Sequence, residues 1–246
     1  MKTFLLVITF TQIVCSQNTN DYVQIGDSLY THFIETVEVF RTKHFPQINK
    51  LAFQEFVIGY ANSIHRKIIK KKNIAAIVDY SKSSNEQRFY VLDLDARKTV
   101  QTSLVAHGRN SGNEFARDFS NEDGSKKSCS GFLLTLNTYS GQHGYSLQLK
   151  GLEKDINDQS FKRAIVIHGA GYVSDEFIKK YGRLGRSWGC PALPPSLSRK
   201  IIDTIKGGSL LYLYAGNNKK RTASNLRAIS KQTIATVNSL FGIEWF

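Results

Sequence analysis

Short β-rich segments, separated by polar or glycine-containing turns, fill the middle of this chain and limit its fold more than any other feature. Each segment is rich in β-branched and aromatic residues and too short to favour a helix. Seven segments are predicted strands: 74–80, 88–94, 100–106, 132–138, 145–149, 164–167 and 210–214. Their number and uneven spacing indicate a mostly β, sandwich-like domain without an internal repeat.

Helical segments are predicted on both sides of the strands. Residues 30–44 and 48–72 carry apolar side chains at helical spacing, and Pro46 separates them. The basic cluster at 66–72 would complement the dipole at the C-terminal end of the second helix. Residues 217–246 are expected to form a basic, amphipathic helical tail. The mostly β domain therefore has accessory helices.

The N-terminus has the pattern of a secretory signal peptide. Lys2 supplies a positive charge, residues 3–14 form an apolar core, and Val14 and Ser16 occupy the −3 and −1 positions of a cleavage site. A buried N-terminal helix and a lipoprotein start at Cys15 are the alternatives. No other apolar run approaches the ~20 residues that span a bilayer. We expect an exported protein, periplasmic or secreted, without stable membrane insertion after signal cleavage.

An excess of basic residues narrows the choice of partner. The 246-residue chain has a formal net charge of +13, and 41% of its residues are hydrophobic. The hydrophobic fraction supplies a globular core, and the charge indicates an anionic partner. The sequence has no nucleic-acid-binding motif and no aromatic and basic platform of the RNA-recognition type. Nucleic acid is therefore not an expected partner.

One glycine-rich segment places a histidine and a cysteine where they suit nucleophilic catalysis. His168 ends an apolar β-rich run, and Cys190 follows a glycine-rich loop. An imidazole can take the proton of a thiol, and the thiolate then attacks a carbonyl. Gly189 permits close backbone approach, so nearby N–H groups would face an oxyanion. Arg183 and Arg186 add positive charge that favours a thiolate and attracts a carboxylate.

Structural roles stay open for the cysteines. A free cysteine is often a small buried hydrophobe, and one cysteine with one histidine proves little. Cys129 and Cys190 remain after signal cleavage, and in an oxidising compartment they could form a disulfide. Cys129 lies in a polar turn and is expected to fill space. Neither a metal nor another cofactor is expected, because no acidic residue has metal-ligand spacing with a histidine.

The order His-Gly, glycine-rich loop, Ser-x-Gly-Cys resembles the catalytic motif of the YkuD-type L,D-transpeptidases, cysteine enzymes of peptidoglycan. The string Gly-Arg-Ser-Trp-Gly-Cys-Pro-Ala at 185–192 is similar to the murein L,D-transpeptidase catalytic domain family. The resemblance extends over about 74–214. It implies a β-sandwich-like catalytic domain, with peptidoglycan stem peptides, rich in carboxylates, as substrates.

By this resemblance, Cys190 matches the nucleophile, His168 the general base, and Gly169 the residue whose carbonyl orients the imidazole. The turn that helps to form the oxyanion site is matched by Ser187, Trp188 and Gly189. Most members of the wider YkuD-type family have His at the position of Trp188, and an apolar residue followed by Arg or Asn at those of Pro191 and Ala192. The partner of the substrate carboxylate therefore stays open, with Arg183 and Arg186 as candidates.

Further histidine and tyrosine side chains are candidates for the cleft. His143 and Tyr145 are expected opposite Cys190, where similar enzymes use an aromatic residue, and an ordinary hairpin turn is the alternative. His107 follows a strand as His168 does, but no second cysteine accompanies it. It is expected to shape a turn or the cleft wall.

We expect an exported cysteine acyltransferase, an L,D-transpeptidase that releases D-Ala through a Cys190 acyl-enzyme. An L,D-carboxypeptidase of the same fold and a non-catalytic peptidoglycan-binding module are the alternatives. In an enzyme, an activated thiolate would alkylate well below the ordinary thiol pKa of about 8.5. The expected division is a signal peptide at 1–16, a linker and helical segment at 17–73, a catalytic domain at 74–216, and the tail at 217–246.

Overall fold

A computed structural model describes residues 27–216 and 226–242, so the predicted signal peptide and the ends of the tail lie outside the described residues. Within these ranges the chain forms eight strands and five helices. All eight strands join one mixed sheet in the order β3-β2-β1-β8-β4-β5-β6-β7. The mostly β fold with accessory helices is confirmed.

The strands begin and end close to the predicted positions, because short runs of apolar, β-branched and aromatic residues mark them. Their bounds are β1 Ile74–Asp79, β2 Phe89–Asp93, β3 Lys98–Ser103, β4 Gly131–Gly141, β5 Gly144–Gly151, β6 Val166–Gly169, β7 Ala192–Leu193 and β8 Leu210–Tyr214. The two-residue strand β7 was not predicted, since it is too short to have a pattern of its own. It exists because it pairs in parallel with β6.

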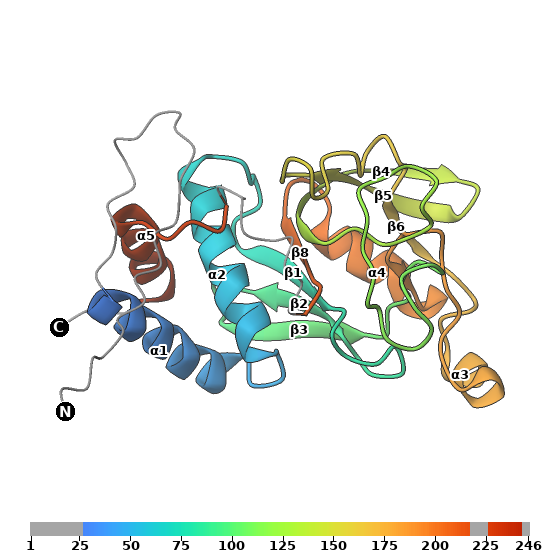
Figure 1. Cartoon of the computed structure of the whole chain (residues 1–246), viewed down its shortest axis with the longest axis horizontal. Coiled ribbons are helices and arrows are strands. Elements are labelled where there is room, and N and C mark those ends of the chain that lie inside the picture. Colours follow the sequence, from blue (N-terminus) through green and yellow to red (C-terminus); the bar gives the residue numbers. More distant parts are fainter. Residues whose placement is uncertain (1–26, 217–225, 243–246) are drawn as a thin grey trace, which may run out of the picture.

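Helices cover both faces of the sheet (Figure 1). Their bounds are α1 Asp27–His44, α2 Lys50–His65, α3 Asp175–Tyr181, α4 Pro195–Ile205 and α5 Lys231–Phe241. Apolar side chains of α1, α2 and α5 share one core cluster with Ile77 of β1 and Tyr212 of β8. Ala76 and Leu211, their neighbours on the opposite face, pack in a second cluster with residues of α4. The sheet is thus a layer between two helical layers.

Helix α2 is shorter than predicted. The side chain of Asn49 caps its N-terminus by accepting the N–H groups of Leu51 and Ala52. The helix ends at His65, and Lys67 has a left-handed backbone with φ of 54°. The basic residues beyond position 66 therefore lie after the helix, and the predicted end at position 72 was wrong. Helices α3 and α4 were missed.

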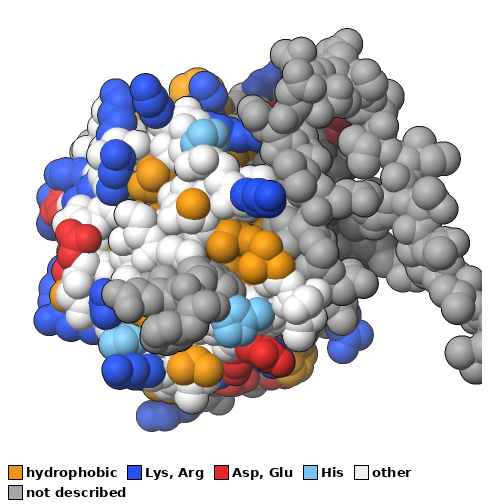
Figure 2. Space-filling model, turned by 90° about the vertical axis from the view of Figure 1, so that its left-hand side faces the viewer, with side chains coloured by type: hydrophobic (Ala, Val, Ile, Leu, Met, Phe, Trp, Pro, Cys, Tyr) orange, Lys and Arg blue, Asp and Glu red, His pale blue; other side chains and the backbone are white. Residues whose placement is uncertain are grey.

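A buried ion-pair network joins the helical layer to the sheet. Arg227, just before α5, binds Glu55 of α2 at 2.6 Å and Glu153 at 2.9 Å. The side chain of Glu153 is fully buried, and it also accepts the backbone N–H of Phe132 in β4. Figure 2 shows the end of the molecule formed by α1 and α5, with Lys and Arg side chains mostly around its edge, hydrophobic side chains near its centre, and acidic side chains at its left and lower edges. Among the described residues, no helix is long and apolar enough to cross a membrane.

Candidate active site

His168 lies on β6, between β5 and β7, and its side chain is only 3% exposed. Ring nitrogen Nδ1 is 3.0 Å from the backbone oxygen of Gly169. Because a carbonyl only accepts, Nδ1 carries the hydrogen in this contact, and Nε2 keeps a lone pair. Nε2 is therefore the atom of this ring that can take a proton.

The pKa of His168 lies below the ordinary histidine value, and burial is the main cause. The hydrogen bond to Gly169 opposes this shift, whereas the nearby charge of His143 adds to it. A histidine with a lowered pKa is neutral at pH 7. His168 is thus in the protonation state that a general base needs.

His143 lies in the tight turn between β4 and β5, and its ring stacks on His168 with centroids 4.5 Å apart. Tyr145 is turned toward α4 instead. Its hydroxyl donates to Asp203 at 2.6 Å, and the guanidinium of Arg199 lies 4.3 Å from its ring centre. Of these two candidates, His143 contacts the candidate base and Tyr145 is engaged by α4.

Cys190 lies two residues before the short strand β7, and its thiol is free and half-buried. Its Sγ lies 3.5 Å from the N–H of Val166 and 3.6 Å from the carbonyl oxygen of Ala164. Among the residues that the structure describes, no hydrogen bond joins this thiol to His168. Cys129, the other described cysteine, is also free and is fully buried.

Burial raises the pKa of the Cys190 thiol. The N–H of Val166 and the charge of Arg163 act in the opposite direction, and Cys129 adds to the rise. The resting thiol is therefore protonated at neutral pH, opposite to the activated thiolate that we expected. Arg183 and Arg186 were expected to favour the thiolate, but the cation that does so is Arg163, which sequence reasoning missed.

The turn before Cys190 is held by its own serine. The hydroxyl of Ser187 donates to the carbonyl of Cys190 at 2.6 Å and accepts the N–H of Gly189 at 3.0 Å. The Ser187 backbone is in turn paired with the neighbouring loop, through the carbonyl of His107 and the N–H of Arg109. The Ser187 side chain therefore holds Gly189 and Cys190 within the turn, and the Ser187 backbone fixes the turn against the neighbouring loop.

A second serine, Ser128, fixes the turn from behind. Its buried hydroxyl donates to the carbonyl of Gly189 and accepts the N–H of Gly108, both at 3.0 Å. Gly189 has φ of 129°, and a Cβ there would lie 2.8 Å from the carbonyl oxygen of Lys127. Only glycine fits this close approach in this conformation. Sequence reasoning missed Ser128, since nothing local marks a serine that binds a loop 61 positions away.

Two backbone donors of this turn have no acceptor among the described residues: the N–H groups of Trp188 and Cys190. In a trans peptide the carbonyl and the following N–H point in opposite directions. Because the Gly189 carbonyl points at Ser128, the Cys190 N–H points away from that serine. An unpaired N–H beside a nucleophile can stabilise an oxyanion. The N–H of Gly189 cannot, because Ser187 already accepts it.

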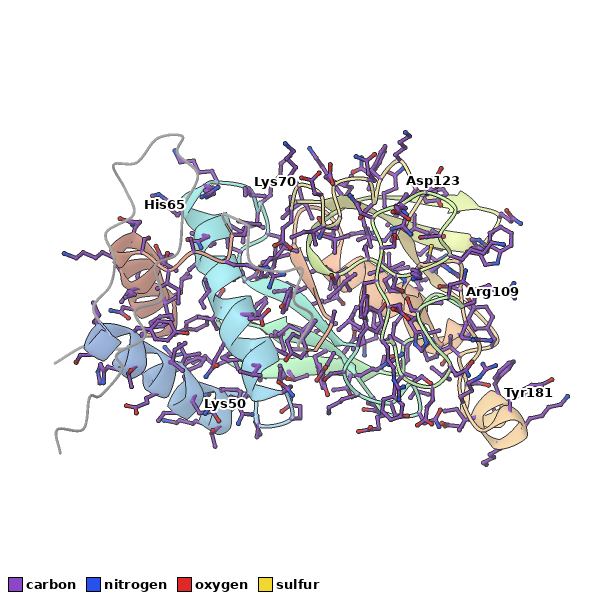
Figure 3. All side chains as sticks on the ribbon, viewed as in Figure 1. Lys50, His65, Lys70, Arg109, Asp123 and Tyr181 are labelled. Carbon is purple, nitrogen blue, oxygen red and sulfur yellow. The ribbon has the colours of Figure 1, made fainter. Side chains whose placement is uncertain are left out.

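Arg183 and Arg186 are engaged by backbone oxygens. Arg186 Nη1 donates to the carbonyls of Arg109 and Gly112 at 3.1 Å and to Asn113 Oδ1 at 2.8 Å. Arg183 Nη1 donates to the carbonyl of Leu184 at 2.7 Å. Burial lowers the pKa of Arg186, and the neighbouring charges of Arg183 and Arg109 lower it further. Figure 3 shows Arg109 at the end of the molecule away from α2.

His107 supports the loop at 107–113 from the interior of the protein. The buried guanidinium of Arg88 donates to its Nδ1 at 2.8 Å, and its Nε2 lies 3.3 Å from the carbonyl of Gly112. Burial, with the charge of Arg88, lowers the pKa of His107 to about 3. This histidine stays neutral at any physiological pH and supports the loop at 107–113, with which the Ser187 backbone pairs.

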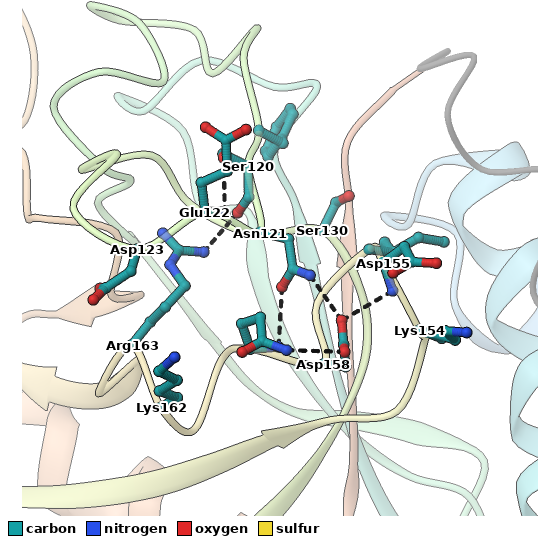
Figure 4. A pocket seen from close by; sticks show the side chains of 13 residues that line it. Ser120, Asn121, Glu122, Asp123, Ser130, Lys154, Asp155, Asp158, Lys162 and Arg163 are labelled. Atoms are coloured by element: carbon teal, nitrogen blue, oxygen red, sulfur yellow. Dashed lines mark hydrogen bonds between the residues drawn. The ribbon is translucent and has the colours of Figure 1, made fainter.

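A cavity of about 650 Å³ lies between the loop that contains Ser120 and the segment that ends at Arg163 (Figure 4). Most of the residues that line it are polar or charged, and Cys190 and His168 are not among them. Arg163 forms one edge of this cavity, and its guanidinium donates to the carbonyl oxygens of Ser120 and Lys127. No group of three or more His, Cys, Asp or Glu in the described ranges could hold a metal.

Known proteins place this chain in a family. The L,D-transpeptidase catalytic domain model matches residues 44–214. Solved structures include an L,D-transpeptidase of Mycobacterium smegmatis (12% identity, TM-score 0.37), covering 58% of this chain and 59% of that one. An Enterococcus faecium L,D-transpeptidase mutant has 11% identity and a TM-score of 0.37, and the match covers 58% of this chain and 50% of that chain. The helical cell shape determining protein Pgp2 of Campylobacter jejuni has 15% identity and a TM-score of 0.39, and the match covers 74% of this chain and 59% of that chain.

This chain therefore spans only 50–59% of those three chains. No curated protein matches it. The structural likenesses are distant, so membership rests on the family match, which covers more than half of the sequence. The chain belongs to the L,D-transpeptidase catalytic domain family.

Proposed function

We propose that this protein is an exported cysteine acyltransferase, an L,D-transpeptidase that acts on peptidoglycan stem peptides. Family membership supports a peptidoglycan-modifying function. The observation that carries the proposal is the pairing of β6 with β7, since it brings the segment of Cys190 beside the strand of His168. The neutral imidazole, with Nδ1 held by Gly169, supports a base role for Nε2.

In the proposed reaction, the thiol of Cys190 leaves its contact with Val166 and turns toward Nε2 of His168. Nε2 takes the thiol proton while sulfur bonds to the carbonyl carbon of the diaminoacid–D-Ala bond. The N–H groups of Trp188 and Cys190 stabilise the oxyanion. The bond to D-Ala then breaks, and the imidazolium returns its proton to the leaving amine.

The acyl group leaves the enzyme in a second step. An amine of another stem peptide attacks the thioester, His168 takes the amine proton, and the proton returns to the departing sulfur. The product is a cross-link. Attack by water instead of an amine gives carboxypeptidase trimming, which is the alternative within the same mechanism.

A non-catalytic peptidoglycan-binding module is the second candidate. The raised pKa of Cys190, and the absence of a hydrogen bond between its thiol and His168 in the described residues, favour this candidate. Such a module would bind peptidoglycan in the cleft and would catalyse no reaction.

Mass spectrometry of a disaccharide-tetrapeptide, incubated with the protein lacking residues 1–16, separates these functions. Cys190→Ala removes the proposed nucleophile. Cys129→Ala is the matched control, because it removes a thiol that is not part of the proposed site. Cross-linked dimers that disappear only with Cys190→Ala support a transpeptidase. Loss of D-Ala without dimers supports a carboxypeptidase. No Cys190-dependent product from folded, reduced protein supports the binding module.

A further inference from the structure

A lysine and a tryptophan beside the Cys190 turn form a pair that the proposed reaction does not yet use. The ammonium of Lys126 lies 4.8 Å from the ring centre of Trp188. The side chain of Trp188 is 70% exposed, although Ser187 before it is 5% exposed and Gly189 after it is buried. Consecutive Cα atoms are 3.8 Å apart, so Trp188 and Cys190 are separated by at most about 7.6 Å. The solvent-exposed indole is therefore attached to the backbone two residues from the nucleophile.

The backbone around Lys126 is held in an unusual conformation. Its φ is 54°, in the left-handed region that a side chain normally disfavours. Such a conformation persists where the surroundings hold it, and it is common at functional sites. Here the carbonyl of Lys126 accepts the N–H of Asn110 at 3.2 Å. Arg163 secures the residues on both sides, through the hydroxyl of Ser125 and the carbonyl of Lys127.

The charge of Lys126 is uncompensated among the described residues, where it has no ion pair with any carboxylate. Its ammonium is therefore available to an anion. Arg183 and Arg186, the candidates from the sequence, donate to backbone carbonyls instead. Arg109 and Arg183 lie close enough to Arg186 for their charges to lower its pKa, so positive charge gathers on the loops that meet at Ser187 and attracts an acidic ligand.

We propose that Lys126 and Trp188 form the subsite for the terminal carboxylate of the donor stem peptide. The ammonium binds the carboxylate, and the indole packs against the aliphatic part of the terminal D-amino acid. This inference rests on the proposed function, because the peptide bond to that residue is the one that Cys190 would attack. It names the carboxylate partner that the family pattern leaves open at Ala192.

Fluorescence titration tests the subsite without any turnover. The chain has two tryptophans, Trp188 and Trp245. In a Cys190→Ala, Trp245→Phe background, Trp188 reports ligand binding directly. Two ligands are compared: a stem tetrapeptide with a free terminal carboxylate and the same peptide with a terminal carboxamide.

The acid is expected to bind about ten- to a hundredfold more tightly than the amide, the range for a hydrogen bond to a charged group. Lys126→Met should remove that preference by weakening acid binding alone, and Lys126→Arg should restore most of it. Lys127→Met, the same loss of charge in the same loop, should change either affinity less than about twofold.

The subsite is refuted if the protein that retains Lys126 binds the acid and the amide equally, or if it binds neither peptide. It is also refuted if Lys127→Met weakens acid binding as much as Lys126→Met does. Product analysis keeps this result separate from the proposed function. Cys190-dependent products without a preference for the acid refute the subsite alone. A preference for the acid without products leaves the subsite standing and refutes the acyltransferase.

Discussion

Replacing Ser128 with alanine tests how the Cys190 turn is held. The hydroxyl is fully buried and bridges two loops, since it accepts from the N–H of Gly108 and donates to the carbonyl of Gly189. Alanine keeps the packing of the Cβ atom and removes both hydrogen bonds. Two buried backbone groups then have no partner.

The cost follows from the number of groups that lose a partner. Each unsatisfied buried group costs about 1–3 kcal/mol, so Ser128→Ala should lower the free energy of unfolding by about 2–6 kcal/mol. For a chain of this size, that corresponds to a fall in Tm of about 4–24 °C. Once the Gly189 carbonyl is released, its peptide can rotate and turn the Cys190 N–H away from the oxyanion. Loss of one such donor lowers kcat about 100–1000-fold.

Two measurements on the same preparation check both effects: thermal unfolding, and Cys190-dependent product formation at a temperature where the variant is fully folded. Ser120→Ala is the matched control. The Ser120 hydroxyl is in the same loop and accepts one bond, from the N–H of the exposed Glu122. It should change stability by less than about 1 kcal/mol. If Ser128→Ala is as stable and as active as Ser120→Ala, the bridge does not hold the turn and our reasoning is wrong.

Four further outcomes are expected. Gly189→Ala should lower turnover at least about tenfold, because its Cβ would lie 2.8 Å from a carbonyl oxygen at a φ of 129°; unchanged kinetics would contradict this. The acid limb of kcat/KM should have its midpoint below about 6.5, because His168 has a lowered pKa and loses its base form only as pH falls through that value. His143→Ala should move this midpoint upward, and a downward move would refute the role of the stacked ring. Alkylation of Cys190 by iodoacetamide should have its midpoint above the ordinary value of about 8.5, because burial raises the thiol pKa; a midpoint below 8.5 would show an activated resting thiolate. Arg227→Met should destabilise the fold by about 3–5 kcal/mol in urea unfolding, because it leaves the buried Glu153 carboxylate unpaired, whereas Lys206→Met at an exposed pair should cost less than about 1 kcal/mol.

Local pattern predicted seven of the eight strands and nominated His168 and Cys190 as candidate site residues. The apolar run before His168 predicts a strand whichever strands lie beside it, and β6 is indeed buried from Val166 to His168. Glycines and a cysteine in sequence order were enough to nominate Cys190, because the chemistry of a thiol nucleophile requires those residue types. Where the pattern weakened, the prediction failed: helix α2 ends at His65, and β7 is only two residues long.

What the sequence determined by itself is the mostly β fold and the choice of His168 and Cys190 as candidates by residue type. Only the tertiary structure decided which polar groups are already engaged. Arg183 and Arg186 read as free cations in the sequence, yet both are bound to carbonyls, whereas Lys126 is available. Ser128 and Arg163 act on residues 61 and 36 positions away. Hydrogen bonds over such separations depend on which loops come into contact in the folded chain. A pattern within one segment of the sequence carries no information about that contact.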